Sequence, residues 1–367
     1  MVALVAGGTQ IDRLAEQVRL FAPARVGVPS ERVASQLSGI LASTGVAVPP
    51  IVSGPDAAAR IAASGADVVL NALTGFAGLE PTLAALDAGS SLALANKESL
   101  VVGGRLVTDR ARPGQIVPVD SEHSAIAQCL RSGRAEEVVR LVLTASGGPF
   151  RGWSREQLAA VTPGQALAHP TWRMGRVVTI NSATLVNKGL ELIEAQRLFG
   201  VGWDRIDVVV HPQSVVHSMV EFRDGATIAS CSPPDMRLPI ALGLTWPDRL
   251  AGVSVACDWR EAVAWTFEPL DNETFPAVEL ARRVGRAGGT APAVFNAANE
   301  VCVDAFCSGN LGFLGILDTV TAVVEAHVGE WGSGATGEQD AELTLGAIHD
   351  ADAWARAEAA RLIGVAA

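Results

Sequence analysis

Over the first 120 residues, short apolar runs rich in β-formers alternate with amphipathic stretches of helical period. The predicted strands are Val2–Ala6, Asp67–Leu73, Ser91–Ala95 and Gln115–Val119. The predicted helices are Ile11–Phe21, Glu31–Leu41, Leu79–Ala88 and Ser99–Ala111. This alternation predicts an α/β region in which helices cover a parallel sheet. Ligands of such sheets bind at the carboxyl ends of the strands.

The middle of the chain, 121–247, has a different pattern. The run Leu141–Ala145 predicts a strand that leads into Ser146-Gly147-Gly148, and a long polar loop over Pro149–Arg176 follows. An amphipathic helix is predicted from Ser182, with later strands over Ile206–Val210 and Val215–Phe222. Several strands with fewer helices predict a central α+β domain.

The last third of the chain indicates a linker over 248–274 and a helical domain over 275–367. Its predicted helices are Ala277–Val284, Ala297–Phe306 and Ala351–Leu362. The glycine-rich stretch Gly329–Gly337 predicts a loop between two helices.

Composition narrows the class of protein. The 367 residues are 49% hydrophobic and 18% charged, and the net charge of −11 argues against a nucleic-acid partner. The opening residues lack a basic signal-peptide region, and no apolar stretch approaches the length of a membrane span. The five cysteines have irregular spacing, which favours reduced thiols over disulfides or zinc. We therefore expect a cytoplasmic protein with no membrane contact.

The strongest chemical signal is Asp120-Ser121-Glu122-His123, which stands where a predicted strand ends. Residues two apart in extended chain point the same way, so Asp120 and Glu122 can present two carboxylates to one Mg²⁺ or Mn²⁺ ion. The alternative is that Asp120 or Ser121 caps a helix over Ser124–Leu130, with Glu122 in its first turn.

A second polar set lies on the helix predicted from Ser182. Thr184, Asn187, Lys188 and Glu191 share one face of it, and the opposite face carries the apolar Val186, Leu190 and Ile193. A cation, an amide and a carboxylate on one face can bind a phosphate beside a metal. The alternative is a solvated helix face with an ordinary Lys–Glu pair.

Three weaker signals also fall at strand ends or in a loop. Asn96-Lys97-Glu98 ends a predicted buried strand, and Ser146-Gly147-Gly148 can bring backbone amides close to an anion. His169 and Trp172 in the long loop suit a lid that closes over a ligand. Each has an ordinary structural alternative, namely a strand-to-helix turn, a simple turn and a surface excursion.

Seven strings, in order along the chain, resemble the 1-deoxy-D-xylulose 5-phosphate reductoisomerase family. The strings are Ala95–Val101, Pro118–Ala125, Leu143–Arg151, Ser182–Glu191, His211–Phe222, Pro234–Pro239 and Asn296–Val301. The resemblance implies an N-terminal Rossmann-like domain over 1–120, a catalytic domain over 121–247 with a lid at 149–176, and a homodimer. It also implies NADPH- and Mg²⁺- or Mn²⁺-dependent isomerisation and reduction of that sugar phosphate to 2-C-methyl-D-erythritol 4-phosphate, in the non-mevalonate isoprenoid pathway.

The resemblance also assigns roles to individual residues. It implies that Asp120, Glu122 and Glu191 bind the metal and that Lys97, Glu122 and His169 are catalytic. The implied substrate-binding set is Lys97, Ser121, Glu122, Ser146, His169, Trp172, Ser182, Asn187, Lys188 and Glu191. The implied NADPH-binding set is Gly7, Gly8, Thr9, Asn96, Glu98 and Gly175.

The sequence departs from the family pattern at its start. The family opens with a strand and a turn of the form Gly-x-Thr-Gly-Ser-Ile-Gly, which places a pyrophosphate at a helix N-terminus. This string does not occur here, and Val2–Ala6 with Gly7-Gly8-Thr9 resembles a later part of the family's sheet. We therefore expect an unfilled place in the sheet between Val2–Ala6 and Asp67–Leu73. One alternative reading is a non-catalytic homologue that binds sugar phosphate and metal without productive NADPH binding, and another is an oxidoreductase for a different phosphorylated substrate.

Overall fold

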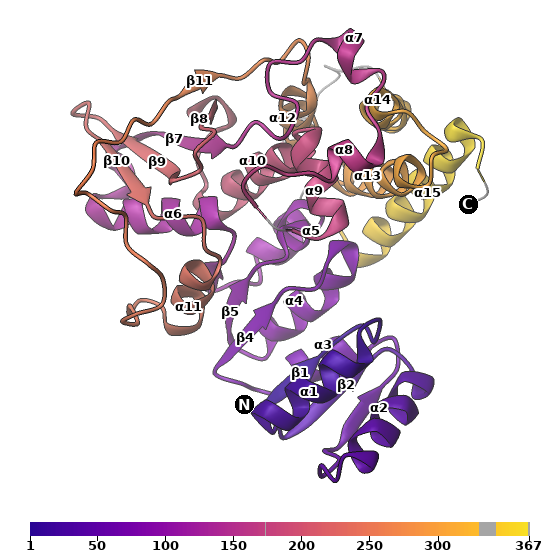
Figure 1. Cartoon of the computed structure of the whole chain (residues 1–367). Helices are drawn as coiled ribbons and strands as arrows, with labels where there is room; N and C mark the ends of the chain where they lie inside the picture. Colours follow the sequence, from indigo (N-terminus) through magenta and orange to yellow (C-terminus); the bar gives the residue numbers. More distant parts are fainter. Residues whose placement is uncertain (173, 330–342, 366–367) are drawn as a thin grey trace. The chain divides into compact units, whose positions relative to one another are not determined.

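The computed structural model describes residues 1–172, 174–329 and 343–365, and the chain forms two compact units (Figure 1). The first unit comprises residues 1–96 and 110–117, and the second comprises 97–109 and 118–367. This division differs from the expected boundaries at 120, 247 and 274. Among the described residues, no helix is both long enough and apolar enough to span a membrane.

The first unit contains two separate three-stranded sheets, with strand orders β1-β2-β3 and β4-β5-β6. The strands are β1 (Ala3–Val5), β2 (Arg25–Val28), β3 (Ile51–Ser53), β4 (Val68–Asn71), β5 (Ser91–Leu94) and β6 (Ile116–Pro118). The helices are α1 (Ile11–Phe21), α2 (Glu31–Ser43), α3 (Ala57–Ala62), α4 (Leu79–Asp87) and the 3₁₀ turn η1 (Gly75–Gly78). The pairings β1–β2, β2–β3 and β4–β5 are parallel, as expected.

Strands β2 and β3 and helix α3 were not among the predicted elements. Both strands are short, and Gly27 interrupts the apolar run of β2, which weakens a strand pattern. The expected gap stays a prediction, and β1 and β4 are edge strands of different sheets. β1 has no fully buried residue and β4 only one, whereas β2 and β5 each bury three of four.

The second unit contains a five-stranded mixed sheet with the order β10-β9-β7-β8-β11. Its strands are β7 (Val138–Ala145), β8 (Ile206–Val210), β9 (Val216–Phe222), β10 (Thr227–Cys231) and β11 (Glu268–Pro269). β7 pairs in parallel with β8 and in antiparallel with β9, as an α+β layer allows. Neither β10 nor β11 was predicted, and both are edge strands with little buried surface.

One core joins the predicted catalytic and C-terminal domains. The helices of the unit are α5 (Lys97–Thr108), α6 (Ser121–Cys129), α7 (Arg155–Leu158), α8 (Pro163–Ala166), α9 (Arg176–Ala183), α10 (Val186–Phe199), α11 (Arg237–Thr245), α12 (Ala277–Ala287), α13 (Ala291–Cys307), α14 (Phe313–Val328) and α15 (Leu345–Ile363). A single apolar cluster runs from Val101 on α5 through Ile193 on α10 to Ala359 on α15. Residues 330–337 of the predicted glycine-rich loop lie outside the described residues.

The segment Pro149–Arg176 contains more helix and more buried side chains than the predicted polar loop. It contains α7 and α8, each starting with a capping box at Ser154 or Thr162, and it buries Phe150 and Leu158. Because these side chains belong to the core, the predicted lid narrows to residues 167–172 and 174–175, and residue 173 lies outside the described residues.

The helix predicted from Ser182 begins later. Ser182 lies in the last turn of α9, Leu185 adopts a left-handed conformation with φ of 61°, and α10 starts at Val186. The Thr184 hydroxyl donates to the carbonyls of Ile180 and Asn181, which satisfies acceptors at the end of α9. The prediction that a single helix runs from Ser182 is therefore wrong, and Thr184 does not share the helix of Asn187.

Candidate active site

Five charged side chains of the second unit meet inside the protein. We call Lys97, Asp120, Glu122, Lys188 and Glu191 the carboxylate–lysine cluster. Lys97 opens α5, Glu122 lies in the first turn of α6, and Lys188 and Glu191 lie one turn apart on α10. Asp120 precedes α6 without capping it through its side chain, so the helix-cap alternative does not describe this carboxylate.

The two ammonium groups bridge the carboxylates. Lys97 Nζ lies 2.5 Å from Asp120 Oδ2 and donates to Glu191 Oε1 at 3.0 Å. Lys188 Nζ donates to Glu122 Oε1 at 2.7 Å and to the second oxygen of Glu191. Asn187 accepts from Lys97 and donates to Glu191. The alternative of a solvated helix face is thus wrong, because Lys188 and Glu191 are 4% and 1% exposed.

Burial and mutual repulsion shape the charges of this cluster. Burial raises the pKa of Glu191 to about 7, and the charge of Glu122 adds to the rise against the pull of the lysines. Burial also acts to raise the pKa of Asp120, but the nearby positive groups, Lys97 first among them, together outweigh it and hold this pKa well below its usual range. The pKa of each lysine is raised, since the carboxylates outweigh burial. The three carboxylates therefore concentrate negative charge in a small volume, and the two ammonium groups balance it only partly.

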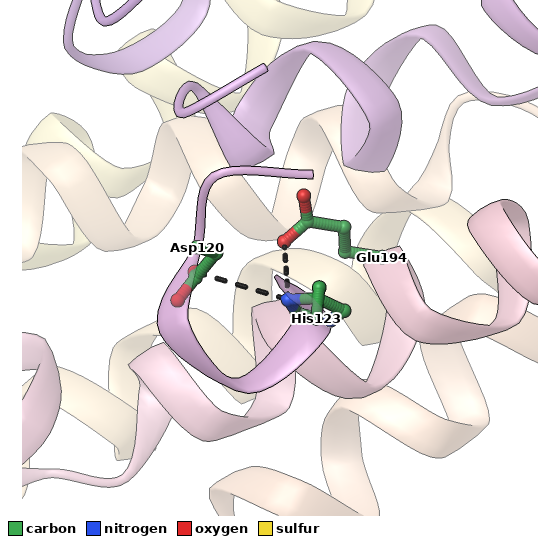
Figure 2. Close-up of side chains that lie close together, drawn as sticks. All are labelled: Asp120, His123 and Glu194. Carbon is green, nitrogen blue, oxygen red and sulfur yellow. Dashed lines mark ion pairs between the residues drawn. The ribbon is translucent and has the colours of Figure 1, made fainter. Parts of the chain in front are cut away.

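His123 and Glu194 lie beside Asp120 and extend the cluster (Figure 2). Neither was among the predicted site residues. His123 Nδ1 lies 3.2 Å from a Glu194 carboxylate oxygen and 4.0 Å from Asp120 Oδ2, and its Nε2 lies 2.8 Å from the Glu191 carbonyl. Burial raises the pKa of Glu194 well above its usual value, and the charge of Asp120 adds to it. A sequence signal existed, because His123 follows Asp120 by three positions and Glu194 follows Glu191 by three, a helical spacing.

A second polar group, the hydroxyl–imidazole cluster, consists of Ser146, His169 and Ser182. His169 Nε2 lies 3.2 Å from Ser146 Oγ and 3.1 Å from Ser182 Oγ. His169 Nδ1 accepts from the backbone N–H groups of Thr171 and Trp172, at 3.1 and 2.9 Å. An acceptor at Nδ1 places the ring proton on Nε2, and burial lowers the pKa of this histidine. The structure thus brings three predicted substrate residues into one neutral, hydrogen-bonding group.

Two more predicted residues stand near these clusters. The Ser121 hydroxyl donates to Glu122 Oε2 at 2.5 Å. Trp172 lies over His217, with ring centroids 6.2 Å apart. His217 was not predicted, although it lies in the string His211–Phe222, and its Nε2 is 2.9 Å from Ser232 Oγ.

The predicted NADPH-binding residues divide between the two units. Gly7, Gly8 and Thr9 connect the carboxyl end of β1 to α1, and Gly8 has a φ of 82°. Asn96 follows β5 and is 2% exposed. In the second unit, Glu98 is buried in the first turn of α5, and Gly175 directly precedes α9. Each assignment to the cofactor stays a prediction.

The donor set of the carboxylate–lysine cluster fits a hard divalent cation. Asp120, Glu122 and Glu191 each offer an oxygen, and these three oxygens lie within 4.8 Å of one another, although 69 residues separate the last two. Three carboxylates face two ammonium groups, which leaves an excess of negative charge for a divalent ion to balance. Carboxylate oxygens are the ligands that Mg²⁺ and Mn²⁺ prefer. The group of Asp120, His123 and Glu194 meets the same distance limit.

Comparison with known proteins gives a consistent family. Residues 1–104 match the family model of 1-deoxy-D-xylulose 5-phosphate reductoisomerase, and 116–199 and 231–358 match models of its C-terminal domains. The reductoisomerase of Cutibacterium acnes is 61% identical over 99% of this chain and 91% of its own length, and that of Kitasatospora griseola is 59% identical over 99% and 92%.

Solved structures show the same likeness. The Zymomonas mobilis reductoisomerase in complex with NADPH is 39% identical, with a TM-score of 0.86 over 99% of this chain and 91% of its own. A DOX-P reductoisomerase in complex with NADPH, fosmidomycin and magnesium is 36% identical, with a TM-score of 0.90 over the same shares of the two chains.

Proposed function

Because the chain belongs to the 1-deoxy-D-xylulose 5-phosphate reductoisomerase family, we propose that it isomerises and reduces this sugar phosphate to 2-C-methyl-D-erythritol 4-phosphate. NADPH and Mg²⁺ or Mn²⁺ are its cofactors, in line with the complexes of the solved relatives. The observation that carries the residue assignment is the convergence of three carboxylates from α6 and α10 beside two lysines.

We assign the cation to Asp120, Glu122 and Glu191. A divalent cation held there would supply Lewis acidity to the substrate's carbonyl and hydroxyl oxygens. The Lys97 ammonium fixes the orientation of Asp120 and Glu191 through its contacts with both carboxylates. Positive charge at this position also favours negative charge that develops on a substrate oxygen.

We assign the substrate phosphate to the hydroxyl–imidazole cluster. Ser146, Ser182 and the Nε2–H of His169 offer neutral donors, and their binding energy can orient the rest of the molecule. Trp172 and the stretch between α8 and α9 would close over the substrate and exclude water. The roles of Ser121, Asn187 and Lys188 in substrate binding are part of the same proposal.

The test is a coupled measurement on the purified chain. NADPH absorbance is followed with 1-deoxy-D-xylulose 5-phosphate and Mn²⁺, and the product is identified by mass spectrometry. The account expects NADPH oxidation that depends on both substrate and cation. Tight binding of substrate and cation without NADPH binding would favour the non-catalytic alternative instead.

We further propose that the chain forms a homodimer in the cytoplasm. The segment from α11 to β11 exposes Leu250, Val255, Trp259, Val263 and Phe267, a density of apolar side chains that is typical of an interface. All five cysteines are free, which suits a reducing compartment. Light scattering coupled to gel filtration should give twice the chain mass, and Val255→Asp should lower it to the mass of one chain.

A further inference from the structure

Two buried asparagines shape the loop that follows β4, which we call the 72–78 loop. Asn71 is the last residue of β4 and is 4% exposed, and Asn96 follows the neighbouring strand β5 and is 2% exposed. Asn71 Nδ2 donates to the Gly78 carbonyl at 2.8 Å, and its Oδ1 accepts from the Leu73 N–H at 3.2 Å. Asn96 Nδ2 donates to the carbonyls of Leu73 and Gly75, at 2.5 and 3.0 Å. Hydrogen bonds from the two buried asparagines therefore fix both ends and the middle of the loop.

These hydrogen bonds also set which way the loop's peptide groups face. In a planar trans peptide the N–H points opposite to the C=O. Because the carbonyls of Leu73 and Gly75 point toward Asn96, the N–H groups of Thr74 and Phe76 point away from it. At these two peptide groups the acceptor therefore points toward Asn96 and the donor points away from it.

The position of the loop points to a ligand. It leaves the carboxyl end of β4, which pairs in parallel with β5, and ligands of parallel sheets bind at this edge. The loop also borders a cavity of about 130 Å³, which Phe76 and Ala77 share with Pro55 and Ala58. A rigid loop with outward N–H donors at this edge is suited to a polar cofactor.

We propose that Asn71 and Asn96 are positioning residues for NADPH, which hold the 72–78 loop in the shape that contacts the cofactor. This inference rests on the proposed function and deepens it, because it gives Asn96 a role through the loop. Loss of either amide would remove its hydrogen bonds to the carbonyls of the loop, and the loop would rearrange. Binding of NADPH would then weaken more than the overall stability falls.

The sheet offers a matched control at its other end. Gln115 is 6% exposed, donates to the carbonyls of Leu86 and Ser90 and accepts from the Arg112 N–H. Its side chain therefore fixes the chain before β6 through hydrogen bonds, as the asparagines fix the 72–78 loop. This position is at the amino end of the same sheet, where no cofactor is expected. A purely structural role would make Asn71, Asn96 and Gln115 equivalent.

The experiment compares Asn71→Ala, Asn96→Ala and Gln115→Ala by NADPH titration, with the Tm of each variant. We expect all three to lower the Tm by similar amounts, but only the asparagine variants to raise the Kd of NADPH, by roughly tenfold or more. The KM of the sugar phosphate should stay within about twofold in all three. An equal rise of Kd in Gln115→Ala, or no rise in the asparagine variants, overturns the inference.

A second variant covers the case in which the asparagine variants do not fold. A Cβ at Gly78 would overlap the Asn96 side chain, whereas its φ of −77° and ψ of −16° suit alanine. Gly78→Ala keeps both asparagines but displaces Asn96, so it should also raise the Kd of NADPH about tenfold. An unchanged Kd in this variant contradicts the proposal. If the unaltered chain binds no NADPH at all, the proposed function itself fails, and the role of the loop fails with it.

Discussion

The carboxylate–lysine cluster and the hydroxyl–imidazole cluster handle charge in opposite ways. In the first, Asp120, Glu122 and Glu191 crowd together, and lysines bridge them. In the second, Ser146, His169 and Ser182 form hydrogen bonds among neutral groups, with the histidine proton on Nε2. Both lie on elements of the same unit, and both contain residues from distant parts of the chain.

Under the proposed assignment, this difference lets one unit bind two ions of opposite sign. Buried carboxylates repel one another, so a cation relieves their repulsion, and Glu191 with its raised pKa is the group that gains most. Neutral donors carry no such repulsion, and they can exchange their hydrogen bonds with one another for hydrogen bonds to a phosphate. The predictions below test whether the first cluster binds the cation and the second binds the phosphate, beginning with the largest effect.

Removing one ligand carboxylate should abolish the cation site. Glu191→Gln keeps the size of the side chain but removes one of three converging charges, so we expect cation affinity and turnover to fall on the order of 100-fold or more. Titration with Mn²⁺, followed by electron paramagnetic resonance, measures the affinity. Glu325→Gln on α14, whose side chain is 48% exposed, is the control and should bind the cation like the unaltered chain. Unchanged Mn²⁺ affinity in Glu191→Gln would remove this residue from the site.

The raised pKa of Glu191 should make the cation-free protein less stable as pH rises. The folded-state pKa of about 7 exceeds the usual 4.5, so the folded state holds its proton more tightly than the unfolded state does. This contribution is fully present below about pH 4.5 and is lost as pH rises to about 7, with an upper limit of roughly 3 kcal/mol. Denaturant unfolding in a chelator at several pH values measures it. Glu191→Gln or saturating Mn²⁺ should flatten the dependence, and a slope that persists in both would place its origin elsewhere.

Loss of the serine hydroxyls should affect the substrate and spare the cation. Ser146→Ala and Ser182→Ala each remove one donor, so we expect the KM of the sugar phosphate to rise roughly tenfold per variant. Mn²⁺ affinity should stay unchanged, since neither serine touches the carboxylates. Ser90→Ala, at a buried serine of the first unit, is the matched control. A fall in Mn²⁺ affinity with unchanged KM would reverse the assignment of the two clusters.

Lys188 tests whether a residue of the carboxylate–lysine cluster also binds the substrate. The family resemblance assigns it to the substrate, but its ammonium contacts Glu122 and Glu191. Lys188→Met should raise the KM of the sugar phosphate about three- to tenfold, yet it should not weaken Mn²⁺ binding, because the carboxylates lose a competing cation. Steady-state kinetics and Mn²⁺ titration separate the two effects. Weaker Mn²⁺ binding would mean that the lysine supports the cation site instead.

The sequence predicted the convergence of the three carboxylates better than it predicted their surroundings. Asp120, Glu122 and Glu191 were predicted to converge because they belong to long, ordered motifs, and the structure brings them together. The buried pair His123 and Glu194 was missed, because a charged residue on a helix looks solvated until its neighbours in space are known. The break between α9 and α10 was missed as well, since Leu185 gives no sequence sign of a left-handed conformation.

The errors in the fold have a similar cause. Short edge strands such as β10 and β11 depend on pairing with distant strands, and periodicity within a few residues cannot reveal the partner. The domain boundaries at 120, 247 and 274 follow the pattern of predicted strands and helices and stay a prediction, although one apolar core continues from α5 to α15. Tertiary packing therefore determines where these short edge strands form.

The most direct test of the division between the two clusters is the position of a bound cation. Crystals grown with Mn²⁺ and inorganic phosphate can be measured at a wavelength where manganese scatters anomalously. The account predicts an anomalous peak among the carboxylates of Asp120, Glu122 and Glu191, with phosphate at Ser146, His169 and Ser182. A manganese peak beside the serines, or none near Glu191, would contradict it.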